Sequence, residues 1–204
     1  MYIPPAFRET DEAAMHATMR AAPLASLVTA TTAGLLCTPL PLLLEPGEGE
    51  RGVLYGHLAR ANPHWREPAL AETLAIFSGP DAYVTPSWYA TKRETGKVVP
   101  TWNYVAVHAY GPAEFFDDPD RLLAVVTRLT ERHERPRPDP WAVADAPADF
   151  IAAQLRGIVG LRLPIARLEG KRKMSQNRGA ADRAGGVATG DSTMHRVAGL
   201  IPRD

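Results

Sequence analysis

The segment Thr101-Trp-Asn-Tyr-Val-Ala-Val-His-Ala-Tyr110 alternates two kinds of side chain and decides the fold class. Trp102 and Tyr104 belong to an aromatic set, whereas Val105 and Val107 belong to an aliphatic set. Side chains of a β-strand point alternately to its two faces, so each set occupies one face. The segment therefore predicts a long strand that packs on both sides.

Upstream of this strand, short β-compatible runs follow one another at hairpin distances. The Thr31-Thr-Ala-Gly34 segment suits a hairpin turn, and Gly79-Pro80 is a turn signal between two further runs. Pro39 and Pro41 each remove a ladder donor, which predicts that their strand lies at an edge or carries a bulge. The predicted strands span residues 24–30, 35–45, 52–58, 74–77 and 82–85, and residues 59–71 are predicted as a loop with a short helical turn.

Helices flank this run of strands. A short helix begins at Thr10–Glu12 and ends before Pro23. The Asp118-Pro119 pair suits an N-cap and the first helical position, so a helix is expected from residue 118 to about residue 133. After a proline-rich connector, a second helix is expected at residues 146–158, followed by a strand at residues 161–168.

This order of elements predicts an α+β fold, with a mainly antiparallel sheet that closes on itself as a small β-barrel and with flanking helices. At 204 residues the chain is long enough for one well-filled core, whereas a second full-sized domain would be cramped. We therefore expect one domain over residues 1–170. Residues 171–204 are expected to form a basic, Gly- and Ala-rich C-terminal tail that is only partly ordered by itself.

The composition excludes several classes of protein. Hydrophobic residues make up 45% of the chain and charged residues 23%, so neither disorder throughout nor a membrane-embedded protein fits. No apolar run approaches the length of about 20 residues that a spanning helix needs, and the first residues lack a secretion signal, so the expected location is the cytoplasm. Cys37 is the single cysteine, which excludes an internal disulfide.

Charge is balanced overall but divided unevenly along the chain. Lys plus Arg and Asp plus Glu both number 23. Residues 114–150 carry nine acids and five bases, whereas residues 156–183 carry eight bases and two acids. The C-terminal basic segment is therefore the charge feature that favours a phosphate-bearing partner.

A first candidate site lies where the predicted strand at residues 52–58 ends. His57 leads into a loop that carries Arg60 and Asn62. A guanidinium group is a forked donor for phosphate oxygens, and an amide with neighbouring backbone N–H groups can complete a cradle. The same residues also fit an ordinary strand-to-helix turn that begins at Asn62-Pro63, and spacing alone leaves both interpretations open.

A second candidate site combines aromatic side chains with lysines. The tryptophans and tyrosines of residues 88–104 can form a planar wall for a fused-ring cofactor, and Lys92 or Lys97 can neutralise its phosphate. The alternative is that these aromatic side chains fill the core and a subunit contact. The two interpretations are compatible with each other.

A third candidate is the segment Gly170-Lys-Arg-Lys-Met-Ser-Gln-Asn-Arg178, which combines four cations with amide and hydroxyl groups. Such a run is either a solvated basic loop or a segment that closes over an anionic ligand or contacts nucleic-acid phosphate. The sequence leaves these alternatives open.

Other chemistries lack their sequence signatures. The six histidines form neither a His-x-x-x-His pair nor a His-Glu-x-x-His motif, so no metal site is expected. The chain has neither a Gly-x-Ser-x-Gly elbow nor a Gly-x-x-x-x-Gly-Lys-Ser/Thr loop, which argues against a serine hydrolase and a P-loop enzyme. No residue is assigned a catalytic role.

A series of motifs runs from the first residue to about Arg183. These motifs are Met1-Tyr-Ile-Pro, Leu54-Tyr-Gly-His-Leu-Ala-Arg-Ala-Asn-Pro, Ser87-Trp-Tyr, Val98-Val-Pro-Thr-Trp-Asn-Tyr-Val-Ala-Val-His108, Trp141-Ala-Val, Asp145-Ala-Pro and Leu168-Glu-Gly-Lys followed by Met174-Ser-Gln-Asn-Arg178. In identity and order they resemble the PaiB-type family of FMN-binding negative transcriptional regulators. A linked series of motifs is far more specific than any one of them.

The resemblance implies an FMN-binding split β-barrel, related to pyridoxamine-phosphate-oxidase-like folds, that works as a homodimer with the flavin at the subunit interface. Together with the candidate sites, it predicts which residues bind the cofactor. Arg60, Asn62 and Lys97 or Lys173 are expected to hold the phosphate. The ring system is expected near His57, Trp102 and Asn103, and Thr101 and Gln176 complete the predicted set.

The leading interpretation is a transcriptional-regulatory or sensory flavoprotein. Neither helix predicted after residue 117 has a basic recognition face, so any DNA or protein partner would contact the basic C-terminal segment. One alternative is a flavin-dependent oxidoreductase that acts on a small molecule. Another is a barrel that has lost its cofactor and serves as a binding module. Whether the protein has turnover is left open.

Overall fold

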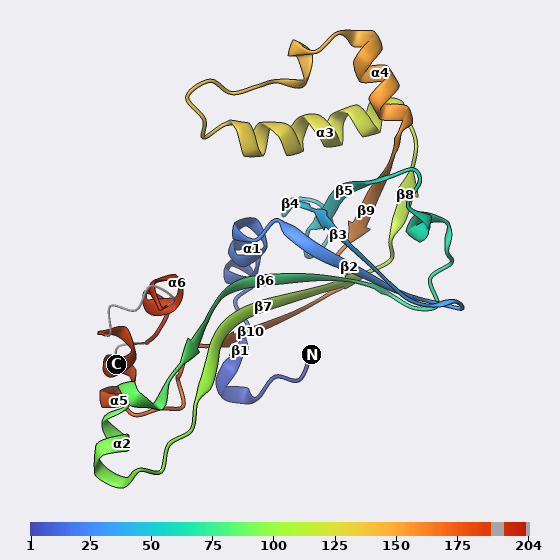
Figure 1. Cartoon of the computed structure of the whole chain (residues 1–204). Coiled ribbons are helices and arrows are strands. Elements are labelled where there is room, and N and C mark those ends of the chain that lie inside the picture. The colour runs from blue at the N-terminus through green and yellow to red at the C-terminus, as the bar shows by residue number, and fades with distance from the viewer. Residues whose placement is uncertain (189–193, 203–204) are drawn as a thin grey trace. The chain divides into compact units, whose positions relative to one another are not determined.

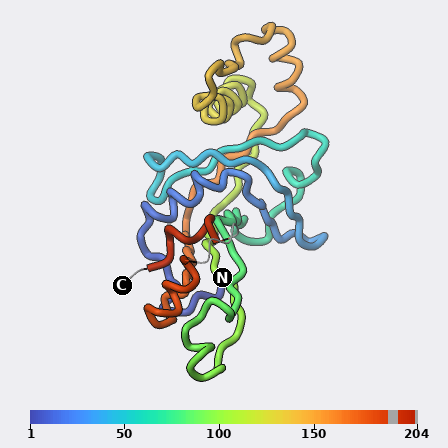
Figure 2. The backbone as a smooth tube through the Cα atoms, turned by 60° about the vertical axis from the view of Figure 1, so that its left-hand side comes forward, coloured from blue at the N-terminus to red at the C-terminus, as the bar shows by residue number. Residues whose placement is uncertain are grey.

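The computed structural model describes residues 1–188 and 194–202, and the chain divides into two compact units. Unit 1 comprises Met1–Thr18, Ser78–Val107 and Glu169–Asp204, and unit 2 comprises Met19–Phe77 and His108–Leu168. Each unit therefore brings together segments that are far apart in the sequence. In unit 1 these are the blue N-terminal, green central and red C-terminal segments of Figures 1 and 2.

The strands of the described residues form two sheets. The strands are β1 (Arg8–Glu9), β2 (Leu24–Thr31), β3 (Gly34–Pro41), β4 (Leu43–Glu45), β5 (Val53–Ala59), β6 (Thr73–Val84), β7 (Thr101–Gly111), β8 (Glu114–Phe116), β9 (Ile158–Pro164) and β10 (Arg167–Lys173). Their hydrogen-bonded order is β1-β10-β7-β6-β2-β3 in one sheet and β4-β5-β9-β8 in the other. The strand pairs within each unit are antiparallel.

Helices connect or flank these strands. They are α1 (Glu12–Ala21), α2 (Ala90–Thr95), α3 (Pro119–Glu134), α4 (Ala148–Arg156), α5 (Ala180–Val187) and α6 (His195–Ala198), with 3-10 turns η1 (Pro5–Phe7), η2 (Pro63–Arg66), η3 (Pro86–Trp88) and η4 (Val143–Asp145). Within residues 1–188 and 194–202, no helix combines the length and the apolar character needed to span a bilayer.

The predicted mixture of helices with antiparallel sheets is confirmed, but the strands do not close into one barrel in the part of the chain that the structure describes. The chain changes sheet between β3 and β4. Pro41 ends β3, the Leu42 N–H donates to the Pro23 carbonyl at 2.8 Å, and β4 then pairs with β5. Pro39 and Pro41 lie on an edge strand, as predicted, because proline offers no ladder donor.

The predicted break at Gly79-Pro80 is wrong, because β6 continues from Thr73 to Val84. β2 pairs only with Leu74–Ile76 of this strand, so Pro80 lies beyond that ladder. A Cβ atom added at Gly79 would lie 3.0 Å from the Val105 Cβ atom on β7. The glycine therefore permits a close approach between strands and does not form a turn.

In unit 2, helix α3 packs against the sheet that contains β5 and β9, with α4 beside it (Figure 1). The Asp118 carboxylate accepts the Arg121 N–H at 2.8 Å, which is the predicted N-cap. Apolar side chains on one side of α3 are buried against the sheet and α4. The buried residues of this core are Leu43, Phe116, Leu122, Val125, Leu129 and Leu155.

Two predicted boundaries after α3 need correction. Helix α4 ends at Arg156, and Ile158 begins β9, because Gly157 closes the helix by donating its N–H to the Gln154 carbonyl at 2.9 Å. The single strand predicted at residues 161–168 is the end of β9 and the beginning of β10.

In unit 1, the segment predicted as a polar tail contributes to a hydrophobic core. Its apolar side chains pack with those of β6 and η3, and the buried members are Ala82, Val84, Tyr89, Met174, Met194, Val197 and Ile201. Gly185 lies within α5, where an added Cβ atom would lie 2.0 Å from the Trp88 carbonyl oxygen. Glycine weakens this helix, but the close contact with η3 leaves no room for a Cβ atom at position 185.

Candidate functional site

Lys173 lies at the end of β10 and is anchored to the beginning of β7 in unit 1. Its ammonium group donates to the Thr101 hydroxyl and, at 2.8 Å, to the Trp102 carbonyl. Burial lowers the pKa of Lys173, and the nearby cations Lys171 and Arg178 lower it further. An ammonium group has three hydrogens, so one of them is left to bind a ligand. The mutual repulsion of the cations favours an anion at this place.

Asn103 provides a second open donor beside this lysine. Its side chain is fully buried, and Oδ1 accepts the Ser175 hydroxyl at 2.9 Å. The amide nitrogen Nδ2 has no hydrogen-bond partner among the described residues. A buried N–H group without a partner costs about 1–3 kcal/mol. Asn103 is therefore prepared to donate to a group that the described residues do not supply.

The loop after β10 has a specific backbone shape. Ser175 has a φ of 61°, in the left-handed region that non-glycine residues rarely adopt. Gln176 stabilises the loop, because its Oε1 accepts the Met174 N–H at 2.6 Å and its Nε2 donates to the Arg172 carbonyl. Consecutive residues of right- and left-handed conformation can direct backbone N–H groups into an anion-binding hollow.

Arg178 and helix α5 complete this side of unit 1. The Arg178 guanidinium lies 4.9 Å from the ring centroid of Tyr89. The Asp182 carboxylate accepts the Thr91 N–H and hydroxyl, both at 3.0 Å, and so joins α5 to α2. These bonds fix the segment that follows the loop.

An exposed aromatic surface lies on the neighbouring strands of unit 1. Trp102 is 51% exposed, and its ring packs edge-on against Tyr83 with 5.9 Å between centroids. The Lys171 ammonium lies 5.1 Å from the Tyr104 ring. Lys97 follows Gly96 at the end of α2, where its side chain is exposed.

The other three predicted cofactor residues lie in unit 2. Arg60 donates from Nε to the Arg156 carbonyl at 2.8 Å and from Nη2 to the Ile158 carbonyl at 3.1 Å. Its Nη1 lies 3.6 Å from a carboxylate oxygen of Asp117. The arginine fork thus joins the end of β5 to the segment between α4 and β9.

Asn62 and His57 have different surroundings. Asn62 is the N-cap of η2, where its Oδ1 accepts the His64 N–H at 3.0 Å, as expected for the ordinary turn. His57 lies on β5, and its buried Nδ1 has no partner among the described residues. Burial lowers the pKa of His57, so the neutral imidazole is favoured.

Five of the nine predicted residues are therefore brought together: Thr101, Trp102, Asn103, Lys173 and Gln176. Lys97 belongs to the same unit without a side-chain bond to the cluster. Sequence reasoning missed the individual roles of Ser175, Arg178 and Lys171, although all three lie within the basic segment that was singled out. We use the name "anion cluster" for Asn103, Lys171, Lys173, Ser175 and Arg178. Its open amide donor and unneutralised cations fit a phosphate group.

Comparison with known proteins identifies relatives that match most of the chain. Residues 1–167 match the family described as "Putative FMN-binding domain". The Bacillus subtilis protein "Protease synthase and sporulation protein PAI 2" is 32% identical over 183 residues, which cover 89% of this chain and 85% of that protein.

Solved structures show a similar fold at low sequence identity. The FAD and heme binding protein from Mycobacterium smegmatis matches with a TM-score of 0.60 and 17% identity, over 88% of this chain and 80% of that one. The flavocytochrome Anf3 from Azotobacter vinelandii matches with a TM-score of 0.59 and 16% identity, over 81% and 69%.

Proposed function

The chain belongs to the family of FMN-binding domains, with FMN as its cofactor, and we propose that the anion cluster of unit 1 holds the phosphate of this FMN in a regulatory or sensory protein. Lys173 and Asn103 are the principal donors in this proposal. Ser175 positions the Asn103 amide, and Gln176 shapes the loop that carries both Ser175 and Arg178.

The observation that carries the proposal is the open amide of Asn103. A fully buried N–H group is almost always paired in a folded protein. Here it lies beside a lysine whose pKa is lowered by burial and, further, by neighbouring cations. A phosphate monoester supplies both an acceptor for the amide and negative charge for the lysine. The same ligand thus satisfies both groups.

The proposal extends to a homodimeric split barrel in which a second copy completes the flavin site. Trp102 and Tyr83 offer flat, exposed aromatic surface of the kind that packs against a ring system or a partner subunit. The contributions of His57, Arg60, Asn62 and Lys97 to FMN binding stay predictions. Among them, the Arg60 fork is engaged by two carbonyls and Asp117, which favours a structural role.

A regulatory role is supported by the B. subtilis relative, whose name refers to protease synthesis and sporulation, and a cytoplasmic location stays a prediction. Bound FMN supplies a reversible redox centre, and the chain supplies binding and orientation. A direct DNA contact through the C-terminal basic segment is the less supported version of this regulatory role. Arg172 and Arg183 donate to the Leu200 and Pro202 carbonyls, so these two cations already serve the fold.

The test compares FMN with riboflavin, which lacks the phosphate. Fluorescence titration of the full chain should show tighter binding of FMN, and Lys173→Met should reduce that preference about tenfold or more, since a hydrogen bond to a charged group contributes about 1.5–3 kcal/mol. Arg93→Met, which removes an exposed cation of α2, serves as the matched control and should retain the preference. Equal affinities for the two flavins in the unmodified protein would reject the anion cluster as the phosphate site.

A further inference from the structure

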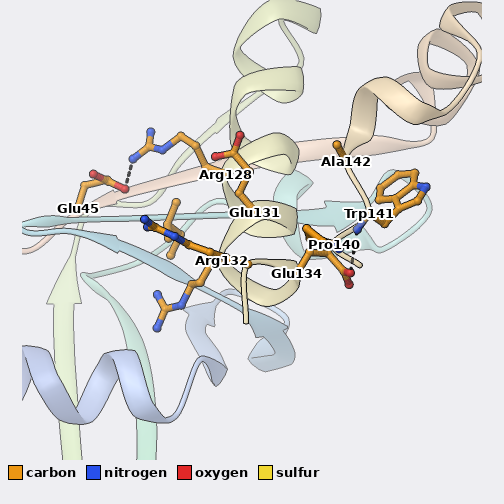
Figure 3. A pocket seen from close by; sticks show the side chains of 10 residues that line it. Glu45, Arg128, Glu131, Arg132, Glu134, Pro140, Trp141 and Ala142 are labelled. Atoms are coloured by element: carbon orange, nitrogen blue, oxygen red, sulfur yellow. Dashed lines mark hydrogen bonds and ion pairs between the residues drawn. The ribbon is translucent and has the colours of Figure 1, made fainter. Parts of the chain in front are cut away.

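The arginines of the two units differ in whether a carboxylate neutralises them. The cavity beside α3 in unit 2 is lined by three glutamates and three arginines, so these charges balance, and Arg128 pairs with Glu45 (Figure 3). In unit 1, Arg178 is half-buried and makes no ion pair with a carboxylate among the described residues. The group that it does contact is the ring of Tyr89.

Tyr89 carries a second buried donor of unit 1 that has no acceptor. Its side chain is 1% exposed and packs in the same hydrophobic core as Met174, the first residue of the loop after β10. The hydroxyl has no hydrogen-bond partner among the described residues, although a buried tyrosine usually finds one. Tyr89 is therefore in the same position as Asn103, whose amide nitrogen is also buried and unpaired.

The charged neighbours of Tyr89 do not accept its hydroxyl hydrogen. The Arg178 guanidinium carbon lies 4.9 Å from the ring centroid, and a guanidinium has only donors. The Asp182 carboxylate is engaged by Thr91, because one oxygen accepts the N–H and the other accepts the hydroxyl, both at 3.0 Å. Burial raises the pKa of Tyr89, so the hydroxyl keeps its hydrogen at neutral pH. The described residues thus leave this hydrogen without an acceptor.

Arg178 connects Tyr89 to the anion cluster. Burial lowers the pKa of Lys173, and the charge of Arg178 is among those that lower it further, so this guanidinium acts on both Lys173 and Tyr89. The Arg178 backbone N–H donates to the Ser175 carbonyl at 2.9 Å, and the Ser175 hydroxyl donates to Asn103. One short loop therefore contacts both of the unpaired donors.

We propose that the Tyr89 hydroxyl donates to the FMN phosphate together with the Asn103 amide, and that Arg178 neutralises part of the phosphate charge. This inference rests on the anion cluster as the phosphate site, and it adds a donor that the proposed function does not use. A phosphate monoester has three terminal oxygens, which can accept from both donors and contact a cation. Tyr89 then contributes to specificity, because riboflavin leaves its hydroxyl unpaired.

Tyr89→Phe removes the hydroxyl and keeps the ring. Titration of the full chain should show FMN binding weakened about tenfold and riboflavin binding changed by less than about twofold, because only FMN carries the acceptor. Urea denaturation of the flavin-free chain should show an unchanged or higher midpoint, since an unpaired buried hydroxyl is removed. Unchanged FMN affinity, equal losses for the two flavins, or a lower urea midpoint would each overturn the proposal.

Tyr55→Phe is the matched control, because the Tyr55 hydroxyl is already paired. It donates to the Glu48 carboxylate at 2.6 Å and accepts from Arg162 Nε at 3.3 Å. This variant should therefore have a lower urea midpoint and an unchanged preference for FMN over riboflavin. If the unmodified chain binds both flavins equally, the anion cluster itself is rejected. If only Tyr89→Phe retains the full preference, the cluster stands and the role of Tyr89 is rejected.

A double-mutant cycle tests whether Tyr89 and Asn103 contact the same phosphate. Groups that share one partner have non-additive effects, whereas the effects of distant and independent groups add. The loss of FMN affinity in the chain that carries both Tyr89→Phe and Asn103→Ala should differ about threefold or more from the product of the two single losses. Losses that multiply within the error of the titration would place the Tyr89 hydroxyl away from the phosphate.

Discussion

The two buried polar clusters of the protein differ in whether their hydrogen bonds are complete. In unit 2, His64 is 1% exposed, and both ring nitrogens have partners: Nδ1 lies 2.8 Å from the Thr38 hydroxyl and Nε2 lies 2.8 Å from the Thr29 hydroxyl. Thr29 contacts Thr73 at 3.1 Å, and Asn62 donates to Thr38 at 3.2 Å. The anion cluster of unit 1 has a buried amide without a partner.

On our proposal, this difference separates a cluster that stabilises the fold from one that holds the FMN phosphate. Each threonine hydroxyl can donate one hydrogen and accept two, so either neutral tautomer of His64 pairs both ring nitrogens while Thr38 also accepts from Asn62. The neutral imidazole thus satisfies the whole network without any further group. In the anion cluster, Asn103 and Lys173 keep donors that only a ligand can use.

The largest expected effect is on stability, from His64→Leu. The substitution removes one buried hydrogen bond from each of the Thr38 and Thr29 hydroxyls, and it should lower the free energy of unfolding by roughly 3 kcal/mol. Urea denaturation measures this change. FMN affinity of the folded protein should stay within about twofold, because the network uses all its groups internally. If the free energy of unfolding decreased by no more than it does in a typical surface substitution, the network would not stabilise the fold.

Asn103→Ala should show the reverse pattern. Removing the open amide should weaken FMN binding about 10- to 100-fold, because a hydrogen bond to a charged acceptor is lost. Stability without FMN should fall by only about 1 kcal/mol, since the amide donor is already unpaired in the protein alone. Asn62→Ala is the matched control in the complete network of unit 2. It should lower stability without weakening FMN binding. The contrast between the clusters fails if the two alanine variants behave alike.

The pH dependence of stability tests the closed network in another way. Burial lowers the pKa of His64 below its usual value of 6.5, so the unfolded chain takes up a proton before the folded one does. Stability is therefore complete above pH 6.5 and falls as the pH decreases below it, by up to about 1.4 kcal/mol per pH unit for one such group. Burial lowers the pKa of His57 as well, so His57→Gln should be measured in parallel. A flat stability profile between pH 7 and pH 5 would contradict the burial of both imidazoles.

Patterns within one element were predictable from the sequence, whereas contacts between elements were not. The alternation of Thr101–Tyr110 gave β7, and Asp118 gave the N-cap of α3, because both depend on neighbouring residues. The turn predicted at Gly79-Pro80 failed because the reason for the glycine lies on another strand, at Val105. Gly185 serves a contact of the same kind, with the Trp88 carbonyl, which lies far from it in the sequence.

The candidate site was predictable to a similar degree. Lys173 and Asn103 were named from the family resemblance, and the fold brings both to one cluster. The left-handed Ser175 and the open Asn103 amide emerge only when β7 and the loop after β10 meet. His64 follows Asn62 closely in the sequence, but the two threonines that bind it come from β3 and β2, and Thr73, which contacts Thr29, comes from β6. No local pattern could have shown that network.

The smallest expected effect concerns Arg60, where the sequence and the structure point to different roles. Its hydrogen bonds to the Arg156 and Ile158 carbonyls predict that Arg60→Gln lowers stability by about 1 kcal/mol, because those carbonyls are partly exposed and can bind water instead. FMN affinity should then change by less than about twofold, whereas a phosphate contact would cost about 1.5–3 kcal/mol of binding. Flavin titration and urea denaturation of the same variant decide between the roles. A large loss of FMN affinity with unchanged stability would assign the phosphate contact to Arg60. The anion cluster would then not be sufficient to bind the phosphate.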